Sequence, residues 1–159
     1  MKYKSFILVT YILFSSAGTI SAKGKKVISW LDATVKAKTE IQTKLKEKKM
    51  SVSSSWIRKG QKPEHFTVNV EGMKKLVLVT TGGADGNSND HGIWANARLI
   101  TKDGKQVWLD KLDYEYGVSG WKSPRKNRDI ANKYIYIAQQ KYDHGILCSA
   151  EGMLVYDLG

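Results

Sequence analysis

The sequence predicts an all-β fold, an antiparallel β-sandwich, and three observations lead to this prediction. Short segments of strand-forming residues recur along the chain, turn residues separate them every ~8–12 residues, and no convincing helical period interrupts them. The composition is 42% hydrophobic and 26% charged, which supplies enough apolar material for a core. A chain of 159 residues suits one domain.

The first 22 residues have the pattern of a signal peptide. Lys2 and Lys4 precede an apolar run at residues 6–14, and small residues follow, with Ala22 or Ala17 as the residue before a cut. The apolar run is about half of the ~20 residues that a membrane span needs, and no other segment could cross a membrane. We therefore expect a secreted or periplasmic protein. The alternative for this run is a short buried strand at the terminus.

The segment after the leader carries two competing patterns. Residues 27–32 are short and apolar, and small or apolar residues then recur every fourth position at residues 33–46, as on one face of a helix. The same residues also alternate with charged and polar ones, and they include β-branched Val and Thr. We favour a strand at 33–46, followed by a further strand at residues 50–57.

The remaining strands are predicted from local pattern. Residues 65–70 alternate between apolar and polar side chains, and residues 76–81 form a continuous apolar run that should be buried on both faces. Residues 93–100 and 106–109 should form a hairpin around Asp103 and Gly104. After an irregular stretch at residues 110–132, three short strands are expected at residues 133–137, 145–149 and 153–158.

The charge and the cysteine content exclude some classes of site. The formal net charge is +11, and cleavage after Ala22 lowers it to +9. A basic exported protein can meet acidic polysaccharide, an anionic surface or nucleic acid, but no nucleic-acid motif is present and a solvated basic surface is the simplest reading. Cys148 is the only cysteine, so no internal disulfide can form, and we expect a buried thiol.

Metal binding and catalysis both have weak support. Residues 85–90, DGNSND, are rich in oxygen ligands, but the EF-hand pattern needs Gly and Glu where Asp90 and Asn96 stand. No cofactor is therefore expected, although structural calcium stays open. Two Asp-His pairs, at residues 90–91 and 143–144, could serve Ser149 or Cys148 as nucleophile, yet no G-x-S-x-G turn is present and adjacent residues point to opposite faces of a strand. We expect no enzyme.

The aromatic residues favour a binding function. Sugars present apolar faces and hydroxyl groups, so a site for them needs an aromatic platform with polar side chains nearby. Most of the aromatic residues in the second half of the chain should be core, with one or two at a binding edge.

Residues 69–99 resemble the closing half of the NPCBM domain, a carbohydrate-binding module related to carbohydrate-binding module family 51. That half contains the pattern V-x-G-x-x-x-L-x-L-V, a G-G-x-D-G loop and the strand D-H-A-x-W-A-x-A-x-L. In that last segment Asp90, His91, Trp94, Ala95 and Ala97 all match, while Gly92 stands where the family has Ala. Residues 45–60 resemble the strands that precede this pattern, and residues 27–32 resemble a still earlier strand.

The second half of the chain resembles the opening half of the same domain. The matching segments are residues 107–112, 120–121, 141–146, 150 and 155–158. A family histidine is missing, because residues 147–149 are Leu-Cys-Ser here. The chain thus carries the closing half at residues 23–100 and the opening half at residues 106–159, in swapped order. Either the domain is circularly permuted, or the chain is an incomplete piece of a larger glycoside hydrolase.

The resemblance implies a fold, a function and partners. The fold is a galactose-binding-like jelly roll over residues 23–159, after a signal peptide at residues 1–22. The function is non-catalytic binding of glycans, galactose-containing ones among them, beside a separate glycoside hydrolase. A degenerate envelope interaction protein without ligand is the alternative. The expected sugar-binding residues are Asp90, His91, Trp94, Asn96, Trp121, Tyr142 and His144.

Overall fold

The computed structural model describes residues 3–13, 52–55, 57–82 and 88–159, and it gives only the backbone for residues 3–13. All described strands belong to one unit of the chain, Met1–Ser15 with Ser54–Gly159. The strands predicted at residues 27–32 and 33–46 lie outside the described residues. No helix in the described part is long and apolar enough to cross a membrane.

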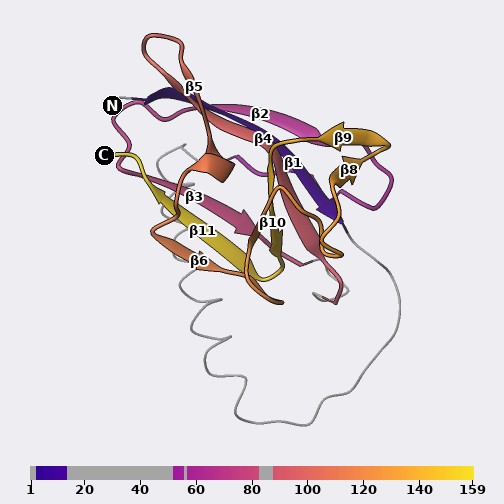
Figure 1. Ribbon diagram of the computed structural model, residues 1–159. Coiled ribbons are helices and arrows are strands. Elements are labelled where there is room, and N and C mark those ends of the chain that lie inside the picture. Colours follow the sequence, from indigo (N-terminus) through magenta and orange to yellow (C-terminus); the bar gives the residue numbers. More distant parts are fainter. Residues whose placement is uncertain (1–2, 14–51, 56, 83–87) are drawn as a thin grey trace, which may run out of the picture. The chain divides into compact units, whose positions relative to one another are not determined.

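The larger sheet contains six antiparallel strands (Figure 1). Their order is β2 (Glu64–Asn69), β1 (Tyr3–Leu13), β4 (His91–Thr101), β10 (Gly145–Ser149) and β7 (Arg125–Lys126), with β5 (Gln106–Trp108) also paired to β4. A short 3-10 helix, η1 (Leu109–Lys111), follows β5.

Two smaller sheets complete the unit. One contains β3 (Lys75–Thr80), β11 (Gly152–Asp157) and β6 (Tyr116–Val118), and the other is the hairpin of β8 (Ile135–Ile137) and β9 (Gln140–Tyr142). Every strand pair is antiparallel. The all-β prediction is confirmed.

Most strands lie close to their predicted positions. The hairpin around Asp103 and Gly104 joins β4 to β5, and Gly104 has the positive φ of 85° that such a turn requires. The strand predicted at residues 50–57 is absent from the described residues 52–55 and 57. β3 is half-buried along much of its length instead of being buried on both faces or nearly so, because only one of its faces meets the core, through Leu78.

Strand β1 falls on the apolar run of the expected leader. It lies between β2 and β4 and pairs with both, from Ser5 opposite Asn69 to Leu13 opposite His91. The structure thus places this run as an inner strand, which is the alternative reading of the same residues.

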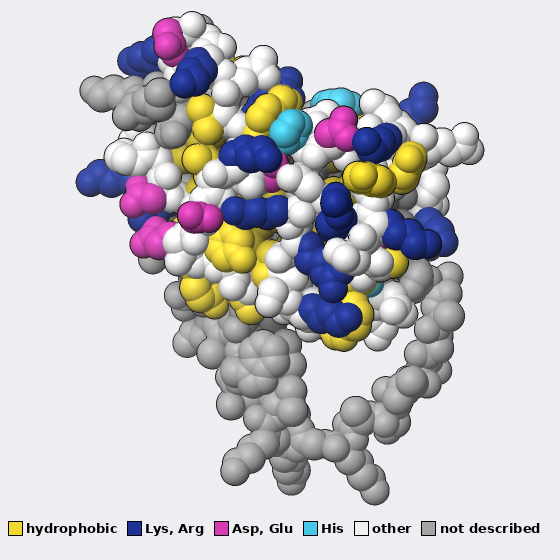
Figure 2. Space-filling view, in the orientation of Figure 1, with side chains coloured by type: hydrophobic (Ala, Val, Ile, Leu, Met, Phe, Trp, Pro, Cys, Tyr) yellow, Lys and Arg dark blue, Asp and Glu magenta, His cyan; other side chains and the backbone are white. Residues whose placement is uncertain are grey.

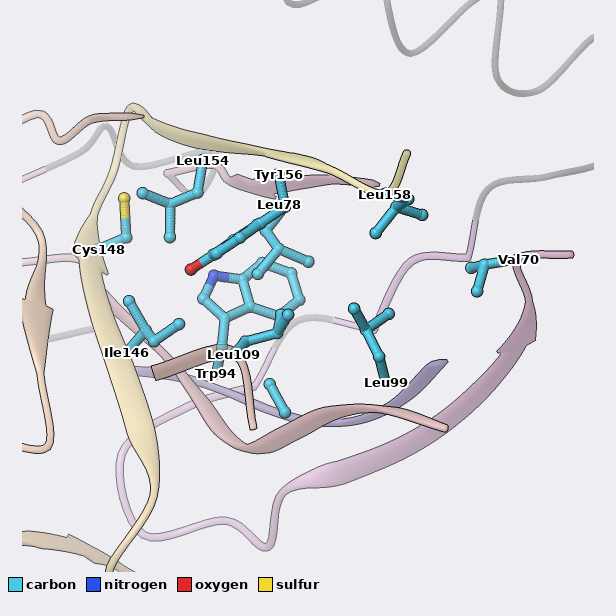
Figure 3. Packing of buried hydrophobic residues seen from close by; sticks show 11 residues of the cluster. Val70, Leu78, Trp94, Leu99, Leu109, Ile146, Cys148, Leu154, Tyr156 and Leu158 are labelled. Atoms are coloured by element: carbon cyan, nitrogen blue, oxygen red, sulfur yellow. The ribbon is translucent and has the colours of Figure 1, made fainter. Parts of the chain in front are cut away.

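The main core lies between the two larger sheets (Figure 3). Trp94, Leu99 and Ile146 of the six-stranded sheet face Leu78, Leu154 and Tyr156 of the three-stranded sheet. Cys148 is 1% exposed within this cluster, and its Sγ donates to the Val118 carbonyl at 3.3 Å, which confirms the prediction of a buried thiol.

Strand β4 packs on both of its faces, and at Asn96 the residues that face the main core change from even-numbered to odd-numbered. Trp94, Ala97 and Leu99 all enter the main core, although 94 and 97 differ by an odd number. Asn96 has φ 50°, and the pairing with β1 shifts between Ala95 and Arg98. This is a β-bulge, in which one extra residue in a left-handed conformation inverts the alternation.

A second core cluster lies on the opposite face of β4 and β10. Ile93, Ala95 and Leu147 pack there against Ile135 and Ile137 of the hairpin, and the cluster also includes Ile57 and Tyr142. The β8–β9 hairpin therefore covers this face of the sheet with its apolar side chains, and the residues that alternate with them point outward.

Strands from the two halves of the sequence pair with each other. Strand β4 of the first half pairs with β10 of the second, and β3 of the first half pairs with β11 of the second. The main core draws on both halves in the same way. Neither half could bury its apolar face without the other.

Candidate functional site

His91 and Ser149 form a hydrogen-bonded pair at one end of the sandwich. His91 is the first residue of β4, Ser149 is the last residue of β10, and the two lie directly opposite each other in the sheet. The His91 Nδ1 atom and the Ser149 Oγ atom are 2.8 Å apart. Ser149 is 1% exposed, whereas His91 is half-buried, so the histidine is the member of the pair that meets solvent.

Trp121 lies beside this pair and is half exposed. Its ring centroid is 6.0 Å from that of His91, with the two planes tilted by 37°, and 50% of the residue is exposed. The Lys122 Nζ atom lies 4.2 Å from the Trp121 ring centroid, as in a cation–π contact. We name these residues, His91, Ser149, Trp121 and Lys122, the His91–Trp121 edge.

Two short contacts place the loop that carries Trp121. The Ser149 amide donates to Ser119 Oγ at 2.9 Å, and the Gly120 amide donates to the Ser149 carbonyl at 3.1 Å. A Cβ atom on Gly120 would lie 2.0 Å from the Ala150 carbonyl oxygen, so only glycine fits there. The Gly-Trp pair that the sequence singled out therefore has a local reason: the glycine brings Trp121 against the end of β10.

Burial favours the neutral form of His91. Desolvation lowers the pKa of its imidazole from the ordinary value of 6.5. At neutral pH this ring is uncharged and presents one N–H donor and one acceptor nitrogen. Nδ1 is engaged with Ser149, and Nε2 has no hydrogen-bond partner among the described residues. Nε2 is thus the atom that can serve a ligand.

Three of the expected site residues lie in the interior instead. Asp90 is 3% exposed and its carbonyl accepts from the Ala150 amide at 2.9 Å. Trp94 is 8% exposed in the main core, and Tyr142 is 6% exposed in the second cluster. Each ring is enclosed by packed side chains, so neither offers a platform to a sugar.

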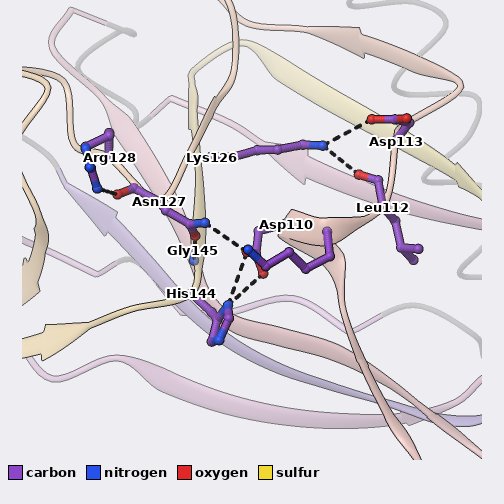
Figure 4. A network of polar contacts seen from close by, with 9 residues as sticks. Asp110, Leu112, Asp113, Lys126, Asn127, Arg128, His144 and Gly145 are labelled. Carbon is purple, nitrogen blue, oxygen red and sulfur yellow. Dashed lines mark hydrogen bonds and ion pairs between the residues drawn. The ribbon is translucent and has the colours of Figure 1, made fainter.

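His144 belongs to a separate polar network (Figure 4). Its Nδ1 atom lies 3.0 Å and 3.1 Å from the two Asp110 carboxylate oxygens, and the Asp110 side chain is 1% exposed. Asn127 donates to the same carboxylate at 2.9 Å and accepts from the Gly145 amide at 2.9 Å. These contacts tie η1, β7 and β10 together.

The same network also encloses Trp108. Its ring stacks on His144 with centroids 4.2 Å apart and planes at 6°, and the Arg98 guanidinium lies 5.2 Å from the Trp108 centroid. Asn96 joins this region through its backbone, since its amide donates to the His144 carbonyl at 2.9 Å. We interpret this group as a structural support, because the Asp110 carboxylate, the Asn127 amide and the His144 Nδ1 atom are engaged with one another.

The geometry gives little support to catalysis. His91 and Ser149 have the spacing of a base and a nucleophile, but Ser149 is buried and no carboxylate orients the His91 ring among the described residues. His144 has its carboxylate, but no hydroxyl or thiol of the described residues is bonded to it.

The described residues contain no group of three or more His, Cys, Asp or Glu side chains that could hold a metal ion. Of the oxygen-rich loop at residues 85–90, only residues 88–90 are among those described. Structural calcium at this loop therefore stays a sequence-based hypothesis.

Some of the predicted site residues lie close together in the structure, and other residues that the sequence did not indicate contact them. It brings His91 and Trp121 together, although 30 positions separate them in the sequence. Lys122 was missed, since a lone lysine in a basic chain carries no signal. Asp110 and Asn127 were missed because only the tertiary contacts with His144 reveal their role.

The NPCBM/NEW2 domain model matches residues 25–100 and 105–159, which make up most of the chain. No curated protein and no solved structure matches the chain. The gap between the two matched segments falls on the β4–β5 turn, and the segments correspond to the two halves that interleave in the sheets. The all-β architecture and the strand β4, which begins at His91 directly after Asp90, agree with this match, so the chain belongs to the NPCBM/NEW2 domain family of carbohydrate-binding modules.

Proposed function

We propose that this protein is an exported, non-catalytic module that binds a glycan at the His91–Trp121 edge, with a galactose-containing sugar as ligand. The observation that carries the proposal is the half-exposed Trp121 ring beside the neutral His91. The apolar face of a sugar ring can lie on the indole, while sugar hydroxyls exchange hydrogen bonds with Nε2 of His91 and with the Lys122 ammonium.

The support for a binding rather than a catalytic role comes from the family and from burial. The family is one of carbohydrate-binding modules, and Ser149 is too buried to attack a substrate. A module of this kind acts by keeping a catalytic domain near its substrate, so we propose a separate glycoside hydrolase as functional partner.

The test is a glycan array followed by titration of the best ligand. We expect Trp121→Ala and His91→Ala to weaken binding about tenfold or more, since each removes a direct contact. Tyr116→Ala is the matched control, because Tyr116 is 49% exposed but lies on β6. Equal effects of Trp121→Ala and Tyr116→Ala, or an array without any ligand, would reject the proposal and favour the degenerate interaction protein.

Export rests on the leader pattern at residues 1–22. The matched family segment begins at residue 25, downstream of the leader. The test is mass spectrometry of the N-terminal peptide from the extracellular or periplasmic fraction. A mature terminus at Lys23 or Gly18 supports export, whereas an intact Met1 terminus in the cytoplasm contradicts it.

We further propose that the domain is a circular permutant rather than a fragment. The pairing of β4 with β10 and of β3 with β11 supports this proposal, because each half supplies strands that the other needs. A chain rebuilt with residues 106–159 ahead of residues 23–105 should fold cooperatively and bind the same glycan. Aggregation of the rebuilt chain, with a monomeric original as control, would argue against permutation.

A further inference from the structure

The outer face of the β8–β9 hairpin carries a second feature that the proposed sugar site does not use. An open groove of about 520 Å³ is lined by Arg128, Asp129, Asn132, Lys133, Tyr134 and Tyr136. None of these residues belongs to the His91–Trp121 edge. The groove therefore needs an explanation of its own.

Two exposed aromatic rings lie in this groove. Tyr134 is 55% exposed and Tyr136 is 58% exposed. They face outward because Ile135 and Ile137, between and after them, point into the second core cluster. The inward residues anchor the hairpin to the second core cluster, so the tyrosines are held at the surface without being part of the core.

Two cations lie over the Tyr134 ring. The Arg128 guanidinium lies 4.9 Å and the Lys141 Nζ atom 4.6 Å from the Tyr134 ring centroid. Lys141 is paired with Asp143 at 2.7 Å. Arg128 and Lys133 form no ion pair with any described carboxylate, so their charges are available to a ligand. In Figure 2, basic and hydrophobic side chains lie next to one another over β8 and β9.

The one carboxylate among the groove-lining residues, that of Asp129, is hydrogen-bonded to its own loop. The Asp129 Oδ1 atom accepts from the Ala131 amide at 2.9 Å and from the Lys133 amide at 2.7 Å. Its carboxylate is thereby turned toward the backbone of its own loop. The Arg125 guanidinium also holds this loop, through the Asp129 and Ile130 carbonyls at 3.3 Å and 3.2 Å.

From these contacts we propose that the groove is a second carbohydrate site and that it binds acidic saccharides, such as chains of uronic acid. The sugar ring lies on the exposed face of Tyr136, and its carboxylate pairs with Arg128 and Lys133. Asn132 and Asp129 offer amide and carboxylate groups to the hydroxyls. A saccharide suits the groove because the exposed Tyr136 ring and the Asn132 amide line it together with Arg128 and Lys133, so that a sugar face, its hydroxyls and its carboxylate each find a matching group.

The test compares two ligands that differ in charge only by their carboxylates, tri-galacturonic acid and the neutral galactose trimer. Titration calorimetry of the full chain at 150 mM salt should give at least about tenfold tighter binding of the acidic trimer. The proposal fails if both trimers bind equally, or if the acidic trimer does not bind at this ionic strength.

Variants assign the binding to the groove. Arg128→Gln and Tyr136→Ala should each weaken binding of the acidic trimer about tenfold. Tyr136→Phe keeps the ring and should bind like the parent. Lys105→Gln removes an equal charge from the exposed β4–β5 turn and is the control for non-specific attraction. Equal losses in Arg128→Gln and Lys105→Gln overturn the proposal.

Two further outcomes identify a different ligand or site. Loss of acidic-trimer binding in Trp121→Ala but not in Tyr136→Ala would place the ligand at the His91–Trp121 edge and refute the second site. Tighter binding of a single-stranded DNA oligonucleotide than of the trimer, weakened by the same two groove variants, would assign the groove to nucleic acid. Failure of this proposal leaves neutral-glycan binding at Trp121 unaffected, so the two proposals are separately testable.

Discussion

His91 combines an ordinary residue type with an unusual position. At the start of β4 it is buried enough for desolvation to lower its pKa, and its Nδ1 atom is engaged with Ser149. Its burial is what makes ionisation unfavourable, while the contact with Ser149 fixes the orientation of the ring. The protein accordingly keeps a neutral imidazole at the edge of a basic surface.

The stability of the protein should fall slightly with acidification because of His91. Its pKa is lower in the folded than in the unfolded state, so the unfolded chain binds the proton first as pH drops below about 6.5. His91→Gln should therefore lose less stability between pH 7.5 and pH 5 than the parent, as measured by urea unfolding at both values. An identical pH dependence of the two proteins would show that His91 is not desolvated.

Trp94 shows that a family residue can be structural. Its ring is buried between the two larger sheets (Figure 3), and its Nε1 atom has no hydrogen-bond partner among the described residues. The indole contributes through apolar contact alone. A smaller aromatic ring should then serve almost as well.

We expect Trp94→Ala to lower the free energy of unfolding by about 3–5 kcal/mol, because it opens a cavity in the main core. Trp94→Phe should cost much less, since it fills most of the space and removes an N–H group without a partner. Chemical denaturation measures both. Glycan affinity of the Phe variant should equal that of the parent, and a selective loss of affinity would return Trp94 to the binding site.

At the scale of elements, the bulge at Asn96 decides how β4 serves both cores. Before it, odd-numbered residues face the hairpin, and after it they face the three-stranded sheet. The extra residue also turns its amide to the His144 carbonyl. Without the bulge, Ala97 and Leu99 would leave the main core.

Substitution of Asn96 tests this role, since its φ of 50° suits Asn and Gly better than other residues. Asn96→Ala should destabilise the protein by about 1 kcal/mol, whereas Asn96→Gly should be close to neutral. Thermal unfolding distinguishes the two. The order of the two variants matters most: an alanine variant as stable as the glycine variant would mean that the left-handed conformation is not retained.

At the scale of the whole molecule, residues 3–13 are both part of the expected signal peptide and the strand β1 of the larger sheet. This strand pairs with β2 on one side and β4 on the other. Cleavage after Ala22 would remove it and leave backbone groups of both neighbours without partners. The processed chain then needs another strand at this place.

Residues 33–46 have the alternating sequence that suits such a place, although they lie outside the described residues. We predict that a chain starting at Lys23 keeps slow hydrogen exchange at the β4 amides, and that deletion of residues 33–46 from it abolishes this protection. Exchange measured by mass spectrometry decides the matter. Fast exchange of β4 in the undeleted processed chain would contradict the prediction.

Local pattern was sufficient for most of the elements. The alternation at residues 65–70, the apolar residues of β3 and β11, and the Asp103-Gly104 turn all follow from short-range backbone and side-chain preferences. The two-residue strand β7 and the bulge in β4 were not predictable, because each depends on a partner strand distant in sequence. The resemblance to the family was likewise readable from the sequence, from residues 69–99 and from the matching segments of the second half.

Which of the aromatic residues are exposed could be determined only from the tertiary structure. Trp94 and Trp121 are both tryptophans in family motifs, yet one is 8% and the other 50% exposed. Exposure depends on which face of a strand another sheet covers, and that is a property of long-range packing rather than of neighbouring residues. For the same reason, the contact between His91 and Trp121, and the grouping of Tyr136 with Arg128, became visible only when the strands were assembled.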